Sequence, residues 1–215
     1  MVARRRYGTS LFLALLLLIG APAGAAELES TPIRVASGSS EATNDNGQRK
    51  FLQTDEGTLE LIYGQLENEV DQIFVTSSAD EGSTWADPIR LSRQEIPARL
   101  GSLAEGPDGR LHAAWVDYET VGHVWYAVRE DGVWSDATKI SPGPFYAGFP
   151  VIAAEADRIH LLWYASVPDE NYDVGSRYEI IHLLNSDGTW GGPTVVSVGG
   201  LDALNPTVAQ DRAGV

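Results

Sequence analysis

The segment GRLHAAWVDY (109–118) has two counterparts elsewhere in the chain, GTLELIYGQ (57–65) and DRIHLLWYAS (157–166). When the three are aligned, Tyr63, Trp115 and Trp163 fall at equivalent places, 52 and 48 residues apart. Each copy is rich in the apolar and aromatic residues that favour β-strands. The chain therefore contains an internal repeat, which constrains the fold more strongly than any single motif does.

A second unit follows each of these segments: DQIFVTSSADEGSTWADPIRLS (71–92), GHVWYAVREDGVWSDATKIS (122–141) and YEIIHLLNSDGTWGGPTVVSV (178–198). The tryptophans of this unit, Trp85, Trp134 and Trp190, lie 49 and 56 residues apart. Two independent markers thus share a period of about fifty residues.

Short strand-like segments parted by Gly, Pro, Asp and Asn fill each period, and no helical period follows the first residues of the chain. Four strands in about fifty residues are typical of a propeller blade. A β-sandwich is the alternative, but it does not explain the repeat. The sequence therefore predicts an all-β protein, a β-propeller of four-stranded blades.

The repeat also sets the expected blade boundaries, at about 50–97, 98–148 and 149–205, with a further blade starting at 206–215. The segment STPIRVAS (30–37) matches the strands that end each repeat, and we expect it to complete the last blade and close the ring. Because propellers typically have about four to eight blades, the region 27–215 is interpreted as part of a longer propeller. An open arc, or closure by self-association, is the alternative.

Residues 1–26 have the pattern of a secretory signal peptide: three arginines, an apolar stretch and small residues before the expected cleavage site. An uncleaved anchor is the alternative, although the apolar run is short for a membrane span. We expect a secreted or periplasmic protein with no membrane span in the mature chain, which would carry 12 basic and 30 acidic residues. This charge disfavours nucleic acid as a partner. The absence of cysteine excludes disulfides and thiol chemistry.

The stretch SADEGSTW (78–85) matches the pattern S-x-D-x-G-x-T-W in full, and REDGVW (129–134) and NSDGTW (185–190) match it in part. This pattern is the Asp-box, or BNR repeat, and the chain resembles the sialidase-like superfamily of β-propellers. The resemblance implies a structural hairpin on the face opposite the active site. The residues assigned this role are Ser78, Asp80, Gly82, Thr84, Trp85, Asp131, Gly132, Trp134, Asp187, Gly188 and Trp190.

A short Asp side chain can accept backbone N–H groups in such a turn, Gly supplies a positive φ, and Trp is expected to pack between blades. The alternative, a calcium loop, needs more oxygen ligands than the turn offers. We therefore expect no metal and no cofactor.

The loops at the other ends of the strands combine acids, arginines and aromatic rings, a mixture that suits a glycan or another polar polymer, and that also occurs in ordinary solvated loops. The candidate ligand-binding residues are Glu69, Arg99, Tyr118, Tyr146, Tyr172 and Arg177. His112 and His160 occupy matching places in the repeat, which favours a packing role over a metal site.

The resemblance also implies candidate catalytic residues. Arg49 lies near the place of the first substrate-binding arginine of sialidases, although the F/Y-R-I-P motif is absent, and Asp71 and Glu69 are possible matches for the acid/base. The leading hypothesis is a propeller that binds glycans or other polar extracellular ligands without catalysis. An exo-acting glycoside hydrolase of sialidase type and a protein-interaction scaffold are the alternatives. The oligomeric state stays open.

Overall fold

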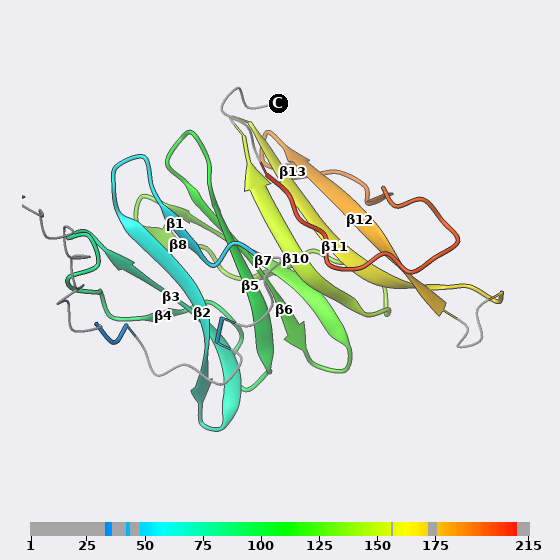
Figure 1. Ribbon diagram of the computed structural model, residues 1–215, viewed down its shortest axis with the longest axis horizontal. Helices are drawn as coiled ribbons and strands as arrows, with labels where there is room; N and C mark the ends of the chain where they lie inside the picture. The colour runs from blue at the N-terminus through cyan, green and yellow to red at the C-terminus, as the bar shows by residue number, and fades with distance from the viewer. Residues whose placement is uncertain (1–32, 36–41, 44–47, 156, 172–175, 210–215) are drawn as a thin grey trace, which may run out of the picture. The chain divides into compact units, whose positions relative to one another are not determined.

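The computed structural model describes residues 33–35, 42–43, 48–155, 157–171 and 176–209. These residues form three antiparallel sheets, which follow one another in chain order (Figure 1). The expected signal peptide lies outside the described residues. The end of the chain from residue 210 also lies outside them. Of the expected closing strand (30–37), only residues 33–35 are described, and they lie in no strand.

The first sheet has the order β1 (Phe51–Gln53), β2 (Leu59–Glu67), β3 (Val70–Ser78) and β4 (Ile89–Arg90). The second comprises β5 (Ala98–Glu105), β6 (Leu111–Tyr118), β7 (Gly122–Glu130), β8 (Val133–Trp134) and β9 (Thr138–Lys139), of which β8 and β9 both pair with β7. The third repeats this arrangement with β10 (Ala147–Ala154), β11 (Arg158–Pro168), β12 (Ser176–Ser186), β13 (Thr189–Trp190) and β14 (Thr194–Val195).

The prediction of an all-β fold of propeller blades is confirmed. Each sheet contains one repeat, and its first three strands are joined by short antiparallel connections. The first sheet has the expected four strands, whereas in the other two sheets the place of the fourth strand is taken by two short strands, β8 and β9 or β13 and β14. In the described part of the chain, no helix has the length and hydropathy needed to cross a membrane.

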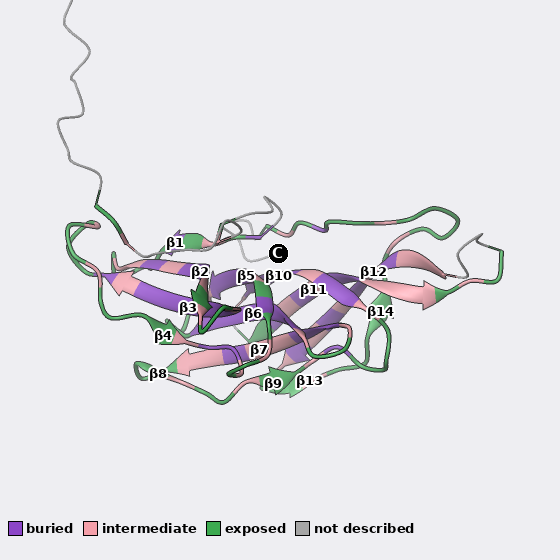
Figure 2. Cartoon of the chain, turned by 90° about the horizontal axis from the view of Figure 1, so that it is seen from below, coloured by how far each residue is buried: buried purple, intermediate pink, exposed green. Residues whose placement is uncertain are grey.

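The core lies in the two seams between neighbouring sheets, where the long strands are buried (Figure 2). In the first seam, Trp115 of β6 packs with Ile62 and Ile73 of the first sheet. In the second seam, Trp163 of β11 packs with Ala114 and Val124 of the second sheet. The indoles of the repeated apolar strand are therefore the central packing groups, with Trp115 fully buried and Trp163 only 1% exposed.

The hairpin tryptophans are half-buried instead. Trp134 packs against the core of the first seam. Trp190 meets the ring of Tyr126 edge to face across the second seam, with ring centroids 5.1 Å apart. Trp85 belongs to the first sheet and covers the glycine turn of its own hairpin at Gly82. Trp190 thus contacts the sheet that precedes it, and Trp134 packs against the core between the first and second sheets.

The turn at 78–85 is held by side-chain hydrogen bonds. Asp80 accepts the backbone N–H of Thr84 (2.7 Å), the hydroxyl of Thr84 (2.7 Å) and the hydroxyl of Ser78 (2.8 Å). Ser78 Oγ in turn accepts the N–H of Gly82 at 2.9 Å. These bonds lower the pKa of Asp80, with the backbone bond from Thr84 as the largest cause.

The two partial copies form a different turn. Asp131 and Gly132 are the central residues of a two-residue hairpin, with φ values of 50° and 78°, and Asp187 and Gly188 repeat it with 52° and 80°. Positive φ at both positions defines the type I′ turn, which matches the twist of the flanking strands. Asp131 and Asp187 therefore lie where Glu81 lies in the full copy, directly before the glycine, and not at the place of Asp80.

We expect Asp80→Ala to lower Tm by a few degrees near neutral pH, because the variant loses the acceptor that orders the turn. The folded-state pKa of Asp80 lies below its ordinary value of 3.8. Its stabilising contribution is therefore present above that value and is lost as the pH falls through the folded-state pKa. Thermal unfolding of the variant and the parent at pH 7 and at pH 2–3 checks this. The exposed Asp87→Ala is the control, and an equal loss of Tm at both pH values would contradict the mechanism.

A serine that recurs at the end of each repeat bonds the outer segment of each sheet to the third strand. Its hydroxyl accepts a backbone N–H from the third strand: Ile73 to Ser92 (3.0 Å), Val124 to Ser141 (3.0 Å) and Ile180 to Ser197 (3.1 Å). The same serine contacts the preceding residue of that strand, which is Gln72, His123 or Glu179. The identities of these partners differ, so the sequence shows only part of the pattern.

Candidate functional site

Five aromatic rings come together at the ends of the strands remote from the glycine hairpins. We call Tyr118, Tyr146, Phe149, Tyr164 and Tyr178 the aromatic cluster. The ring centroids are 6.4 Å apart for Tyr118–Tyr146, 5.8 Å for Tyr146–Tyr164, 6.4 Å for Tyr146–Tyr178, 5.2 Å for Phe149–Tyr164 and 5.2 Å for Tyr164–Tyr178. Four of the rings are half-buried and Tyr164 is 9% exposed, so the cluster is held in place and still reaches solvent.

Glycines make room for the central ring, Tyr146. A Cβ atom at Gly122 would lie 2.7 Å from Cε2 of Tyr146, and one at Gly148 would lie closer still to the hydroxyl end of the ring. Real side chains do not approach so closely, so any other residue at either position would displace the ring. The two glycines therefore fix Tyr146 between β7 and β10.

A bulge in the first strand of the third sheet directs Phe149 toward the cluster. The β10–β11 register shifts between Gly148 and Val151, and Phe149 has φ of 54°. The second sheet has a similar bulge, with a register shift between Arg99 and Ser102 and with Leu100 at φ of 63°. Bulky residues rarely adopt positive φ, and such strain is concentrated at functional positions.

An ion pair lies beside the cluster. Arg99, which acts electrostatically on Tyr118, contacts the carboxylate of Asp71 at 2.6 Å. Arg177 contacts Asp169, and its guanidinium lies 2.6 Å from Glu179, but strand alternation places Arg177 on the face of β12 opposite to Tyr178. The pair of Arg99 and Asp71 therefore offers a donor and an acceptor beside the rings.

The phenol of Tyr118 stays protonated in the neutral range. Burial raises the pKa of Tyr118 well above its usual value, and a hydrogen bond with Tyr146 raises it further. Tyr118 is therefore a neutral hydroxyl that can donate or accept a hydrogen bond, and not an anionic nucleophile.

A buried polar network supports the same end of the second sheet. Asp117 accepts the indole N–H of Trp115 at 2.7 Å and the Nε–H of Arg93 at 2.9 Å. The guanidinium of Arg93 also lies over the ring of Trp125, 4.1 Å from its centroid, and near Glu119. Burial raises the pKa of Asp117, and the bond from Arg93 opposes that change.

The structure brings together three of the predicted ligand-binding positions. Tyr118 and Tyr146 belong to the cluster, and Arg99 acts electrostatically on Tyr118. Arg177 directly precedes Tyr178 in β12, and strand alternation places it on the opposite face of the sheet. Glu69 is exposed in the two-residue turn between β2 and β3, and Tyr172 lies outside the described residues.

The two predicted catalytic residues line different cavities. Asp71 pairs with Arg99 beside a cavity of about 10 Å³, whereas Arg49 lines one of about 230 Å³ with Ser102 and Thr207. Within the described ranges, no contact joins Arg49 to Asp71. Nor does any group of three His, Asp or Glu side chains there have a geometry that could hold a metal ion.

Three rings of the cluster were absent from the sequence-predicted site residues: Phe149, Tyr164 and Tyr178. Tyr164 follows the inward-facing Trp163, and strand alternation places it on the opposite face of the sheet. This alternation is the feature of the sequence from which Tyr164 could have been predicted to lie outside the core. Phe149 joins through its bulge, which the sequence alone does not specify.

No protein-family model and no curated protein matches the sequence. Among solved structures, the chain is similar to an ulvan lyase of polysaccharide lyase family PL25 bound to GlcA(1-4)Rha3S (TM-score 0.56, 14% identity, covering 71% of this chain and 44% of that one). It is also similar to an α-L-arabinofuranosidase from Fusarium graminearum in complex with an iminosugar inhibitor (TM-score 0.53, 14% identity, 67% and 46%). A third is an α-L-arabinanase from Penicillium chrysogenum complexed with arabinobiose (TM-score 0.50, 16% identity, 69% and 48%).

The chain spans less than half the length of these three solved structures. At 14–16% identity the likeness shows the fold alone. All three structures are glycan-active enzymes, and their fold is the propeller type seen in the blades of this chain.

Proposed function

We propose that this chain is part of an exported, sialidase-like propeller that binds a glycan along the aromatic cluster. The observation that carries the proposal is the continuous set of rings from Tyr118 to Tyr178, part-exposed and bordered by the ion pair of Arg99 with Asp71. Aromatic faces stack on the apolar faces of sugar rings, and fixed carboxylates and guanidinium groups bond sugar hydroxyls. Binding sites commonly combine an apolar surface with a few well-placed polar groups.

The similar structures support a glycan as the ligand class, since their names describe enzymes that act on polysaccharides or arabinosides. Fold likeness is an analogy, and the argument for this chain rests on its own side chains. The signal-peptide pattern at 1–26 supports a secreted or periplasmic location, where glycan polymers are encountered.

Binding is preferred over sialidase-type hydrolysis because of how the candidate catalytic groups are engaged. The carboxylate of Asp71 is occupied by Arg99, and Arg49 lines a separate cavity. A general acid must reach the glycosidic oxygen, and the carboxylate of Asp71 is turned toward the guanidinium of Arg99 instead.

We expect Tyr146→Ala to weaken glycan binding at least tenfold, because it removes the ring that contacts three others in the cluster. Affinity for ligands found on a glycan array is measured by calorimetry. Phe145→Ala is the matched control, since Phe145 is the adjacent residue, is 48% exposed and is outside the ring contacts of the cluster. Equal loss in both variants, or no glycan ligand at all, would count against the proposal. Turnover of a fluorogenic sialoside that is lost in Arg49→Ala would favour the enzyme instead, and a captured protein without a glycan would favour a scaffold.

A further inference from the structure

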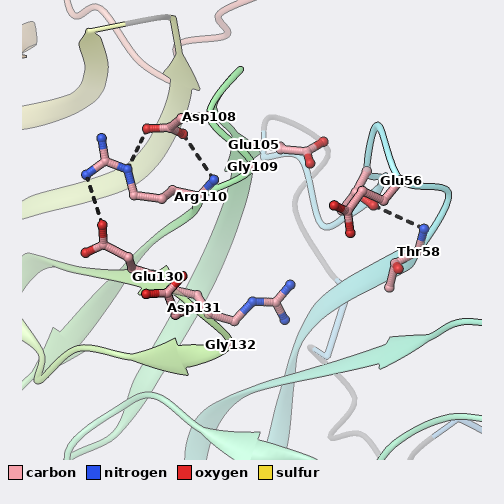
Figure 3. Close-up of a pocket in the computed structure, with 11 residues that line it drawn as sticks. Glu56, Thr58, Glu105, Asp108, Gly109, Arg110, Glu130, Asp131 and Gly132 are labelled. Atoms are coloured by element: carbon pink, nitrogen blue, oxygen red, sulfur yellow. Dashed lines mark hydrogen bonds and ion pairs between the residues drawn. The ribbon is translucent and has the colours of Figure 1, made fainter.

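Two cavities occupy equivalent places in the two seams, at the strand ends remote from the aromatic cluster. The first, of about 560 Å³, lies between the first and second sheets and is shown in Figure 3. The second, of about 620 Å³, lies between the second and third sheets and is called the seam pocket here. Both volumes fall in the range of ordinary ligand sites.

In the first seam an ion pair crosses between the sheets. Glu60 of β2 is 1% exposed, and its carboxylate lies 2.6 Å from the guanidinium of Arg129 on β7. Arg129 lines the cavity in Figure 3 together with carboxylates such as Glu56, Glu105 and Glu130. A buried charge has to be paired, and here the partner comes from the facing sheet.

The repeat places His112 and Asn185 at the corresponding positions of the second seam. His112 lies three residues before Trp115, as Glu60 lies three before Tyr63. On the facing strand, Asn185 pairs with Ile159 as Arg129 pairs with Leu111. Residues at matching places of the repeat lie on the same face of equivalent strands, so the two residue pairs are structurally equivalent.

These two residues do not bond to each other across the seam. The Nδ1 of His112 is 2.7 Å from the hydroxyl of Tyr126, on its own sheet. Asn185 is only 7% exposed, and its side-chain amide forms no hydrogen bond with any other residue in the described ranges. It lines the seam pocket, so a buried amide with two donors and an acceptor is available to a ligand.

The seam pocket also has an aromatic wall that the first cavity lacks. Tyr126 and Trp190, in edge-to-face contact, both line it and both are half-buried. Burial lowers the pKa of His112 to about 4, so His112 is neutral from pH 5 upward. At the mouth, Arg110 is engaged by Asp108 at 2.5 Å and Arg158 lies 3.9 Å from Asp157, and further carboxylates come from Glu155 and Asp187. The inner part is neutral and the rim is mostly acidic, which disfavours an anionic ligand.

We propose that the seam pocket binds a neutral sugar unit, which stacks on Trp190 and bonds the side-chain amide of Asn185. The site is separate from the aromatic cluster, because the two lie at opposite ends of the same strands. It therefore does not depend on the function proposed for the cluster, and the chain would hold a glycan at two places.

NMR of the ¹⁵N-labelled chain tests the proposal, with arabinobiose, cellobiose and lactose as neutral probes and glucuronic acid as the anionic probe. The expected result is a saturable shift of the Asn185 amide and the Trp190 indole N–H with at least one neutral probe and no shift with glucuronic acid. The proposal is overturned if none of the neutral probes moves these signals, or if glucuronic acid moves them equally.

Two variants make the assignment specific. His112→Glu combined with Asn185→Arg rebuilds in the second seam the ion pair that spans the first, and it should abolish the response while the fold is kept. The isosteric Asn185→Asp replaces the amide donors with a charge and should weaken binding at least tenfold. This single variant tests the same position if the double variant does not fold. Tyr146→Ala should leave the response unchanged. Unaltered affinity in Asn185→Asp, or loss in Tyr146→Ala, contradicts a separate site.

Discussion

Trp163→Ala is expected to destabilise the chain by about 3–5 kcal/mol, the usual cost of truncating a large buried aromatic side chain. Trp163 is 1% exposed and lies in the centre of the second seam, so the variant leaves a cavity between two sheets. Since single domains are stable by only about 5–15 kcal/mol, the variant should be close to unfolding at room temperature. The free energy of unfolding is measured by urea denaturation followed by circular dichroism.

Trp85→Ala is the matched comparison, because Trp85 is half-buried over its own hairpin. Trp85→Ala should lower the free energy of unfolding much less than Trp163→Ala does. Equal losses of stability in the two variants would contradict the conclusion that the strand tryptophans are the central packing groups between the sheets.

Arg93→Ala is expected to cost roughly 2–3 kcal/mol at pH 7, because it leaves the carboxylate of Asp117 buried without its charge partner. The side chain of Asp117 is 0% exposed and that of Arg93 is 31% exposed, so solvent screening places the effect below that of a fully buried pair. The exposed Arg158→Ala, whose partner Asp157 lies 3.9 Å away, should change stability little.

The cost of Arg93→Ala should depend on pH in a defined direction. Burial raises the pKa of Asp117 above its ordinary value of 3.8, and removing Arg93 leaves that effect unopposed. An acid whose folded-state pKa is raised binds more protons in the folded chain, so stability falls as the pH rises through the interval between the two pKa values. The difference between variant and parent should be largest at neutral pH, should shrink as the pH falls through the raised folded-state pKa values of Asp117, and should be smallest at pH 3.8 and below. A constant difference across this range would mean that Arg93 acts by packing on Trp125, not by charge.

Much of the candidate site could be placed from the sequence. Tyr118, Tyr146, Arg99 and Arg177 stand near strand ends, and antiparallel strands of a blade bring those ends to one edge. The ion pair of Asp71 with Arg99, however, joins residues 28 positions apart on different sheets. Which carboxylate meets which guanidinium depends on how two sheets pack, and no local pattern encodes it.

The sequence by itself determined the fifty-residue period, the strands and the turns, because strand alternation and turn chemistry act over a few residues. Only the tertiary structure decided which tryptophans are buried and that Asp131 and Asp187 occupy a different turn position from Asp80. It also decided that the side chain of Asn185 lines a cavity with no bonded partner among the described residues, whereas Arg129 at the equivalent position forms an ion pair with Glu60. The physical reason is that these outcomes depend on the neighbouring sheet. A residue's burial and polar partners are set across a seam, by side chains that lie a whole repeat away in the chain.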